Sequence, residues 1–244
     1  SVTERLDYSH LHGWTPISLR RAAEPTVEWA DMRPCAFADA PFSRIIDDWR
    51  AGAAHPTAHT ALAAFAALDD QPSLDPDLII AHPSRSGSTL LARLAAARDD
   101  TLLLSEPGIL QQLLTLDLVK PLDQPVVRVL RQIVRALGRI RFGWEQRYVL
   151  KLNSQMTRFL PAISAAFPTT PIIWLQREPA EIVQSNLRRP ARGGTTHGDL
   201  VGWALRRTTL AFLAATAFVD RQVHVLDYRD LPEAAWTRVA RLIG

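Results

Sequence analysis

From residue 77 onward, short apolar segments alternate with longer segments of helical character. The apolar segments are continuous rather than alternating, which is typical of strands that are buried on both faces of a parallel sheet. The predicted strands are 77–82, 101–106, 147–152, 171–177 and 222–228. The predicted helices are 88–98, 108–116, 124–141, 157–166, 179–188, 199–219 and 232–242. This order predicts an α/β fold with a mainly parallel sheet and helices on both faces.

The first 76 residues follow another pattern. Residues 1–52 are rich in Trp, Pro and Arg and show weak periodicity, which predicts an irregular lead-in with short helical turns such as 42–51. The segment 55–70 is predicted to be a helix, and the Pro-rich segment 71–76 a connector. We therefore expect an N-terminal extension, residues 1–76, that packs on a core domain, residues 77–244, to form one structural unit.

Composition narrows the class of protein. The 244 residues are 47% hydrophobic and 22% charged, which is enough for one sizeable core, and the net charge of +3 suits an anionic ligand without requiring nucleic acid. Cys35 is the only cysteine, so an intrachain disulfide is excluded and a reduced, cytoplasmic location is expected. No apolar run is long enough to span a bilayer. A homodimer is compatible with the sequence, which does not fix the oligomeric state.

The stretch "HPSRSGSTLL" joins the strand at 77–82 to the following helix. A helix N-terminus offers unpaired N–H groups to a phosphate, and a glycine lets the backbone approach it closely. The candidate phosphate ligands are Arg85, Ser86, Gly87, Ser88 and Thr89.

This stretch only partly matches the G-x-x-x-x-G-K-[ST] phosphate loop. Gly87 and Thr89 fit that pattern, whereas His82 replaces the first glycine and Ser88 replaces the lysine. An N-capped helix after an ordinary turn is the alternative interpretation.

A second motif follows a later strand in "WLQREPAEIVQSN". Arg177 is expected at the carboxyl end of that strand, Pro179 suits the first turn of a helix, and Ser185 lies two turns further on. Both polar side chains could then reach one phosphate group. The alternative is that Arg177 only caps the helix or pairs with Glu181.

Together, the two motifs resemble those of the sulfotransferases. The resemblance covers most of residues 77–244 and implies a P-loop-type fold, 3′-phosphoadenosine 5′-phosphosulfate (PAPS) as the donor, and no metal. It implies that residues 85–89 hold the 5′-phosphosulfate and that Arg177 and Ser185 hold the 3′-phosphate. In "HVLDYRDL", Tyr228 matches a family tyrosine beside the nucleotide, although a tyrosine packed at a strand end is an equal alternative.

The resemblance also indicates which residues do the chemistry. Glu106, in "TLLLSEP", matches the branch of the family that uses a glutamate as the base; the alternative is a carboxylate favoured by a helix N-terminus. Lys151 and Arg85 are the expected cations near the leaving group, and Lys151 is one of only two lysines. The implied acceptor is a hydroxyl or amine of a small molecule, carbohydrate or peptide.

Two other functions remain open from the sequence. A P-loop kinase would place Thr89 on magnesium with Asp227 or Glu106 as the acidic partner, but the lysine expected at position 88 is missing. A non-catalytic nucleotide-binding domain is the other alternative.

Some further side chains have two interpretations. Trp203 could stack on adenine, although a core-facing tryptophan is favoured. A basic helix face, which could bind an acidic acceptor or be solvated, is predicted from Arg128, Arg131, Arg135 and Arg139. The Gly- and Arg-rich segment 188–198 is read as a lid or a plain loop.

Overall fold

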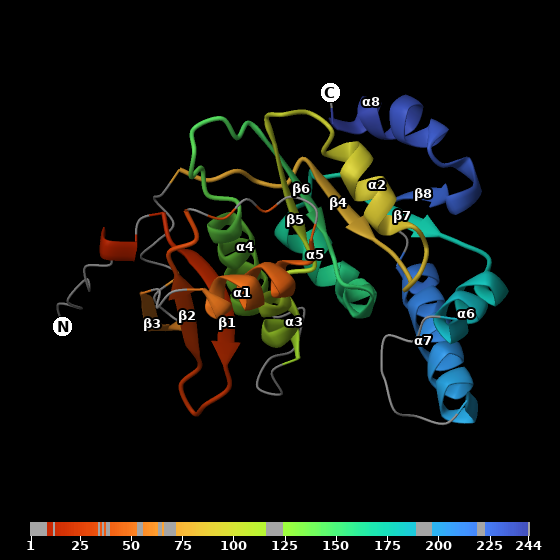
Figure 1. Cartoon of the computed structure of the whole chain (residues 1–244), viewed down its shortest axis with the longest axis horizontal. Coiled ribbons are helices and arrows are strands. Elements are labelled where there is room, and N and C mark those ends of the chain that lie inside the picture. Colours follow the sequence, from red (N-terminus) through yellow and green to blue (C-terminus); the bar gives the residue numbers. More distant parts are fainter. Residues whose placement is uncertain are drawn as a thin grey trace.

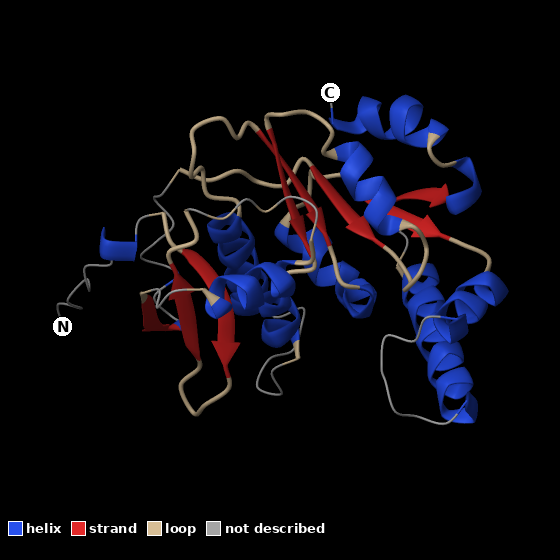
Figure 2. Cartoon of the chain, viewed as in Figure 1, coloured by secondary structure: helices blue, strands red, loops and turns tan. Residues whose placement is uncertain are grey.

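The computed structural model describes residues 9–11, 13–33, 35, 37, 40–52, 56–62, 65, 72–115, 124–188, 197–218 and 223–243. Within these segments, five strands form one parallel sheet and three form a smaller antiparallel sheet (Figures 1 and 2). The parallel strands are β4 (Leu78–Ala81), β5 (Thr101–Ser105), β6 (Arg147–Lys151), β7 (Ile172–Gln176) and β8 (Val223–Asp227). All five strands of the sequence prediction are confirmed, and so is the α/β fold class.

The order of the parallel strands is β5-β6-β4-β7-β8, so β4 is central. Because the strands are parallel, the loops that follow β4, β5, β6 and β7 all leave from one edge of the sheet. Ligands of open α/β sheets bind at this carboxyl edge. The fold therefore brings the two sequence motifs to the same edge.

Helices cover both faces of the parallel sheet, as predicted. The α-helices of this part are α2 (Ser88–Ala95), α3 (Gly108–Leu114), α4 (Gln124–Leu137), α5 (Leu160–Ala166), α6 (Pro179–Arg188), α7 (His197–Ala217) and α8 (Ala240–Ile243). Shorter turns are the 3₁₀ segments η3 (Ser154–Phe159) and η4 (Tyr228–Asp230) and the π-helical segment η5 (Ala235–Val239). None of the helices in the described segments has the length and apolar character needed to cross a bilayer.

Alternate residues of β4 serve two different cores. Leu78 and Ile80 pack in a cluster with α2 and η5, whereas Ile79 and Ala81 belong to the larger cluster on the opposite face. Both clusters exclude water, which explains why the strand is apolar at every position.

The N-terminal part contains a sheet that the sequence prediction missed. The strands β1 (Thr15–Arg20), β2 (Thr26–Ala30) and β3 (Thr57–Ala61) pair antiparallel in that order, and the predicted helical turn is present as α1 (Phe42–Ala51). A three-residue 3₁₀ turn, η1 (Ser9–Leu11), precedes β1. The register of β1 shifts between Pro16 and Ser18, which obscures its period-2 pattern.

The helix predicted over 55–70 is wrong over residues 57–61, which form β3. This strand pairs with β2, and the Thr60 hydroxyl accepts a 2.9 Å hydrogen bond from Trp29 Nε1. Alanine favours helix locally, but pairing with a neighbouring strand outweighs that preference here. Residues 55, 63, 64 and 66–70 of the predicted helix lie outside the described segments.

Arg131 of α4 and Arg139, two residues beyond the end of that helix, join the N-terminal part to the core. The Arg139 side chain is buried, donates to the carbonyls of Leu11 and Trp14 at 3.2 and 2.7 Å, and lies 5.2 Å from the Trp29 ring. Arg131 pairs with Asp75 at 2.6 Å. Arg131 and Arg139 are therefore held by structural contacts, whereas Arg128 is exposed, and acceptor binding by this face stays a prediction.

Candidate active site

The loop after β4 has the geometry of an anion-binding turn. Gly87 has φ +85° and is the N-cap residue of α2, whose first N–H groups face the loop. A Cβ on Gly87 would lie 2.5 Å from two ring atoms of Tyr228, so only glycine fits between the loop and this ring. The N-terminus of α2 offers unpaired N–H groups to a ligand, while the Tyr228 ring occupies the space that a side chain at Gly87 would need.

Two non-glycine residues of the described segments have positive φ, and both lie at this edge of the sheet. They are Arg85, with φ +63°, and Glu106, with φ +57°. Such backbone conformations cost about 1–3 kcal/mol each and gather at functional sites. The sequence motifs and the backbone strain therefore point to the same residues.

Two serines of the loop, Ser86 and Ser88, are buried. Ser86 is fully buried, and its Oγ has no hydrogen-bond partner in the described part of the chain. Ser88 is 5% exposed, whereas Thr89 is exposed. A buried hydroxyl without a partner costs free energy, which an oxygen of a bound ligand would offset.

Glu106 and Lys151 form an ion pair at the ends of β5 and β6. The Lys151 ammonium contacts Glu106 Oε1, and the Glu106 backbone N–H donates to the Lys151 carbonyl at 2.7 Å. The Lys151 side chain is only 2% exposed and lies behind the carboxylate, which is 28% exposed. The pair compensates the burial of the lysine and fixes the carboxylate at the sheet edge.

The loop after β4 and the Glu106 side chain border one cavity of about 590 Å³. It is lined by residues of the β4 loop, the ends of β5 and β6, α6 and α7, namely His82, Ser84, Arg85, Ser86, Gly87, Ser88, Thr89, Glu106, Asn153, Ser154, Gln155, Ser185, Trp203 and Arg207. All five predicted loop residues, Glu106 and Ser185 therefore face one space. Its volume is in the range of small-molecule sites.

Arg177 and Tyr228 lie beside the loop and are not among the described residues that line the cavity. Arg177 donates to the carbonyl of Arg85 at 3.2 Å and pairs with Glu181 at 2.8 Å, as the alternative interpretation expected. Its guanidinium lies 4.5 Å from the centre of the Tyr228 ring, which itself packs on Gly87. The second motif thus contacts the first directly, through backbone and ring.

His82 lies at the base of the loop and is 4% exposed. Its two ring nitrogens lie 2.9 Å from the carbonyl oxygens of Pro83 and Leu152. Burial, together with the charge of Lys151, outweighs the opposing effect of the two carbonyl contacts and lowers the pKa of His82 to about 4. The ring is therefore neutral near pH 7 and donates to one of the two carbonyls.

We expect this shift to make stability depend on pH. The unfolded chain keeps a histidine pKa near 6.5, so it binds more protons than the folded chain between about pH 6.5 and 4. The contribution of neutral His82 is therefore complete above this window and lost as the pH falls through it. Between pH 7 and about pH 4.5, wild type should lose about 2 kcal/mol more unfolding free energy than His82→Gln.

Urea unfolding at the two pH values measures this difference. The exposed His59 in β3 supplies the control, because His59→Gln should keep the wild-type pH dependence. Equal pH dependence in wild type and His82→Gln would contradict a neutral buried ring.

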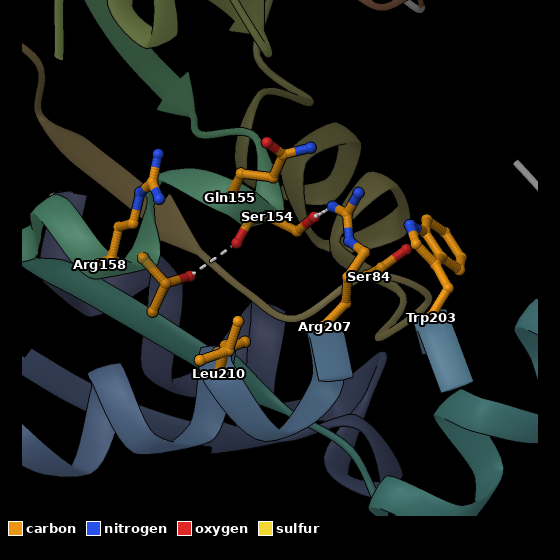
Figure 3. Close-up of a pocket in the computed structure, with 9 residues that line it drawn as sticks. Ser84, Ser154, Gln155, Arg158, Trp203, Arg207 and Leu210 are labelled. Carbon is orange, nitrogen blue, oxygen red and sulfur yellow. Dashed lines mark hydrogen bonds between the residues drawn. The ribbon is translucent and has the colours of Figure 1, made fainter. Parts of the chain in front are cut away.

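Arg207 and Ser154 belong to neither sequence motif, and the sequence favoured a core position for Trp203. The structure places Trp203 and Arg207 at the cavity instead. The two side chains lie one turn apart on α7 (Figure 3). Arg207 donates to Ser154 Oγ at 2.7 Å and lies 5.0 Å from the Trp203 ring centre. The i, i+4 spacing of an aromatic residue and an arginine was the available signal. Residues 189–196 of the predicted lid lie outside the described segments.

The kinase alternative needs an acidic partner for Thr89. Asp227 is hydrogen-bonded to Arg229 at 3.0 Å, and this contact holds the pKa of Asp227 at about 2. Asp227 is not among the described residues that line the cavity. Glu106 is the carboxylate residue among them, and it is already paired with Lys151.

No protein-family model matches the chain, and no curated protein matches its sequence. Among solved structures, the chain is similar to the sulfotransferase STF1 of Mycobacterium tuberculosis, with a TM-score of 0.50 and 20% identity over 73% of this chain and 69% of that one. It is also similar to the sulfotransferase STF9 of Mycobacterium avium (TM-score 0.47, 14% identity, 87% and 75% covered). A third match is the sulfotransferase domain of the Synechococcus PCC 7002 olefin synthase (TM-score 0.44, 20% identity, 72% and 75% covered).

At this level of identity, the likeness concerns the fold. The chain has the P-loop sulfotransferase-like fold, with its parallel sheet flanked by helices. The resemblance of the sequence motifs to sulfotransferases is thereby confirmed at the level of architecture.

Proposed function

We propose that the protein transfers a sulfuryl group from PAPS to a hydroxyl or amine of a small molecule, carbohydrate or peptide. One observation carries the proposal: the Glu106 carboxylate lines the same cavity as the β4 loop, with Lys151 paired to it from behind. A proton acceptor and an anion-binding loop at one cavity are the two elements that such a transfer requires.

The residues of the loop fit the phosphosulfate end of the donor. The Ser86 hydroxyl is buried without a partner in the described segments, and the N-terminus of α2 favours negative charge. Arg85 is exposed at the cavity and can donate in a forked geometry. Ser86, Gly87, Ser88 and Arg85 would hold this group, with Thr89 at its edge.

The chemistry that the protein's own residues supply is proton transfer and charge stabilisation. The acceptor oxygen forms a bond to sulfur while the bond between sulfur and the donor's phosphate oxygen breaks, and Glu106 takes the acceptor's proton. Adenosine 3′,5′-bisphosphate leaves, and Arg85 stabilises the charge that develops on its phosphate. Because Lys151 is buried behind Glu106, we assign it the positioning of that carboxylate rather than the contact with the leaving group expected from the sequence.

The 3′-phosphate is assigned to Ser185 and Arg177, with Tyr228 beside the adenosine. Ser185 lines the cavity from α6, which supports its part directly. Arg177 would have to exchange its contact with Glu181 for the phosphate, which an exposed ion pair permits at low cost. The contacts of Arg177 with Arg85 and Tyr228 hold it next to the loop, whether it pairs with Glu181 or with the phosphate.

Calorimetric titration with adenosine 3′,5′-bisphosphate tests the proposal. We expect binding by wild type, and a loss of about ten- to a hundredfold in affinity for Arg177→Ala, because a charge-assisted contact is removed. Arg206→Ala is the control, since this exposed arginine of α7 is not among the described cavity residues. Binding of ATP with magnesium in place of the bisphosphate would favour a kinase, and equal binding by Arg177→Ala would contradict the assigned 3′-phosphate site.

A further inference from the structure

A second, smaller cavity of about 250 Å³ opens beside the first (Figure 3). The two cavities share the lining residues Ser84, Ser154, Gln155, Trp203 and Arg207. A molecule that presents a hydroxyl to Glu106 in the large cavity can therefore extend into the small one. The small cavity lies between η3 and α7, and neither Glu106 nor Lys151 is among the described residues that line it.

The walls of the small cavity combine an apolar surface with positive charge. Leu210, which is 59% exposed, and Ala211 supply the apolar part from α7. Arg158 reaches the cavity from η3, and its guanidinium lies 4.6 Å from the ring centre of Phe159. In the described part of the chain, Arg158 forms no ion pair with a carboxylate, and no acidic residue lines this cavity.

The second arginine of this cavity is held in place by its neighbours. The hydrogen bond from Arg207 to Ser154 and its position over Trp203 fix it where the two cavities meet. Figure 3 shows Arg158 on one side of the cavity and Arg207 on the other, with Leu210 between them on α7. The exposed guanidinium of Arg158 favours a bound anion, because no acidic residue is among the described residues that line this cavity.

We propose that the small cavity selects acceptors that carry an anionic group, such as a carboxylate, separated from the reacting hydroxyl by an apolar body. Arg158 binds the anion and Arg207 adds charge at the junction. Trp203 and Leu210 contact the apolar body. The reacting hydroxyl at Glu106 rests on the proposed sulfotransferase function, whereas the anion site rests on the arginines alone.

The test compares two probes of equal shape, 4-hydroxyphenylpropionate and its primary amide, in the presence of adenosine 3′,5′-bisphosphate. Calorimetry should show that wild type binds the carboxylate about tenfold more tightly than the amide, as a charge-assisted contact predicts. Arg158→Gln should lose this preference. Arg206→Gln, an exposed arginine on the same helix as Arg207, should keep it.

Transfer from PAPS to both probes is measured separately, so that the two proposals can fail independently. A preference for the carboxylate without any transfer would support the anion site and contradict the sulfotransferase function. Equal or absent binding of the two probes, or an unchanged preference in Arg158→Gln, would overturn the anion site. A loss of bisphosphate affinity in Arg158→Gln would assign the cavity to the donor, which also overturns it.

Discussion

Glu106→Gln is expected to lower the turnover of sulfuryl transfer by about 10² to 10⁴, because the amide cannot take up the proton of the acceptor. The substitution keeps the shape of the side chain, and the amide oxygen can still accept a hydrogen bond from Lys151. Glutamine also tolerates the same backbone as glutamate at φ +57°. The effect on turnover should therefore come from the chemical step, with the fold retained.

Binding of adenosine 3′,5′-bisphosphate separates these two effects. Its affinity should stay within about twofold of wild type in Glu106→Gln, because the loop ligands are untouched. Glu24→Gln is the matched control, since Glu24 is exposed in the turn between β1 and β2. Wild-type turnover in Glu106→Gln would remove Glu106 as the base and would leave the bisphosphate site unaffected.

The removal of the carboxylate also leaves Lys151 buried without a negative partner. Breaking one half of a buried pair costs up to about 3–5 kcal/mol, because the remaining charge is uncompensated. The pair borders the cavity, and Glu106 is partly exposed, so we expect a smaller loss of stability. Urea unfolding of Glu106→Gln shows whether lost turnover reflects chemistry or unfolding.

The parallel sheet could be predicted from sequence because its information is local. Each of the five strands is apolar along most of its length, the central strands are buried on both faces, and the turn and helix signals between the strands are strong. The sequence signal for strand formation is weaker in the antiparallel strands β1 to β3. β3 is alanine-rich and forms an edge strand of the small sheet. Its extended conformation depends on pairing with β2, which local propensity does not include.

The candidate site also contains residues that local sequence predicts and contacts that it does not predict. The loop residues and Glu106 follow strands directly, so the sheet alone places them at one edge, and the structure finds them around one cavity. The contact of Arg207 with Ser154 depends on how α7 packs against η3, which are far apart in the sequence. The burial of Lys151 behind Glu106 depends on the pairing of β5 with β6. Neither contact has a local signature.

Gly87→Ala should abolish most bisphosphate binding, because it combines two separate costs at one position. The left-handed backbone at φ +85° is unfavourable for alanine, and the new Cβ would lie 2.5 Å from the Tyr228 ring. Either the ring or the loop must move. Since Arg177 lies on the same ring and donates to the loop, movement disturbs both motifs at once. We expect at least about tenfold weaker binding and a stability loss of about 1–3 kcal/mol.

Two further variants separate the backbone cost from the clash. Gly143 has φ +82°, and a Cβ added there would meet no atom within 4 Å, so Gly143→Ala should carry only the backbone cost and bind the bisphosphate as wild type does. Combining Gly87→Ala with Tyr228→Ala removes the clash and should recover part of the stability lost by Gly87→Ala alone. Urea unfolding and calorimetric titration of these variants measure the two costs. If Gly87→Ala binds the bisphosphate like wild type, the loop after β4 is not the donor site, because a ligand held by that backbone would sense the displacement.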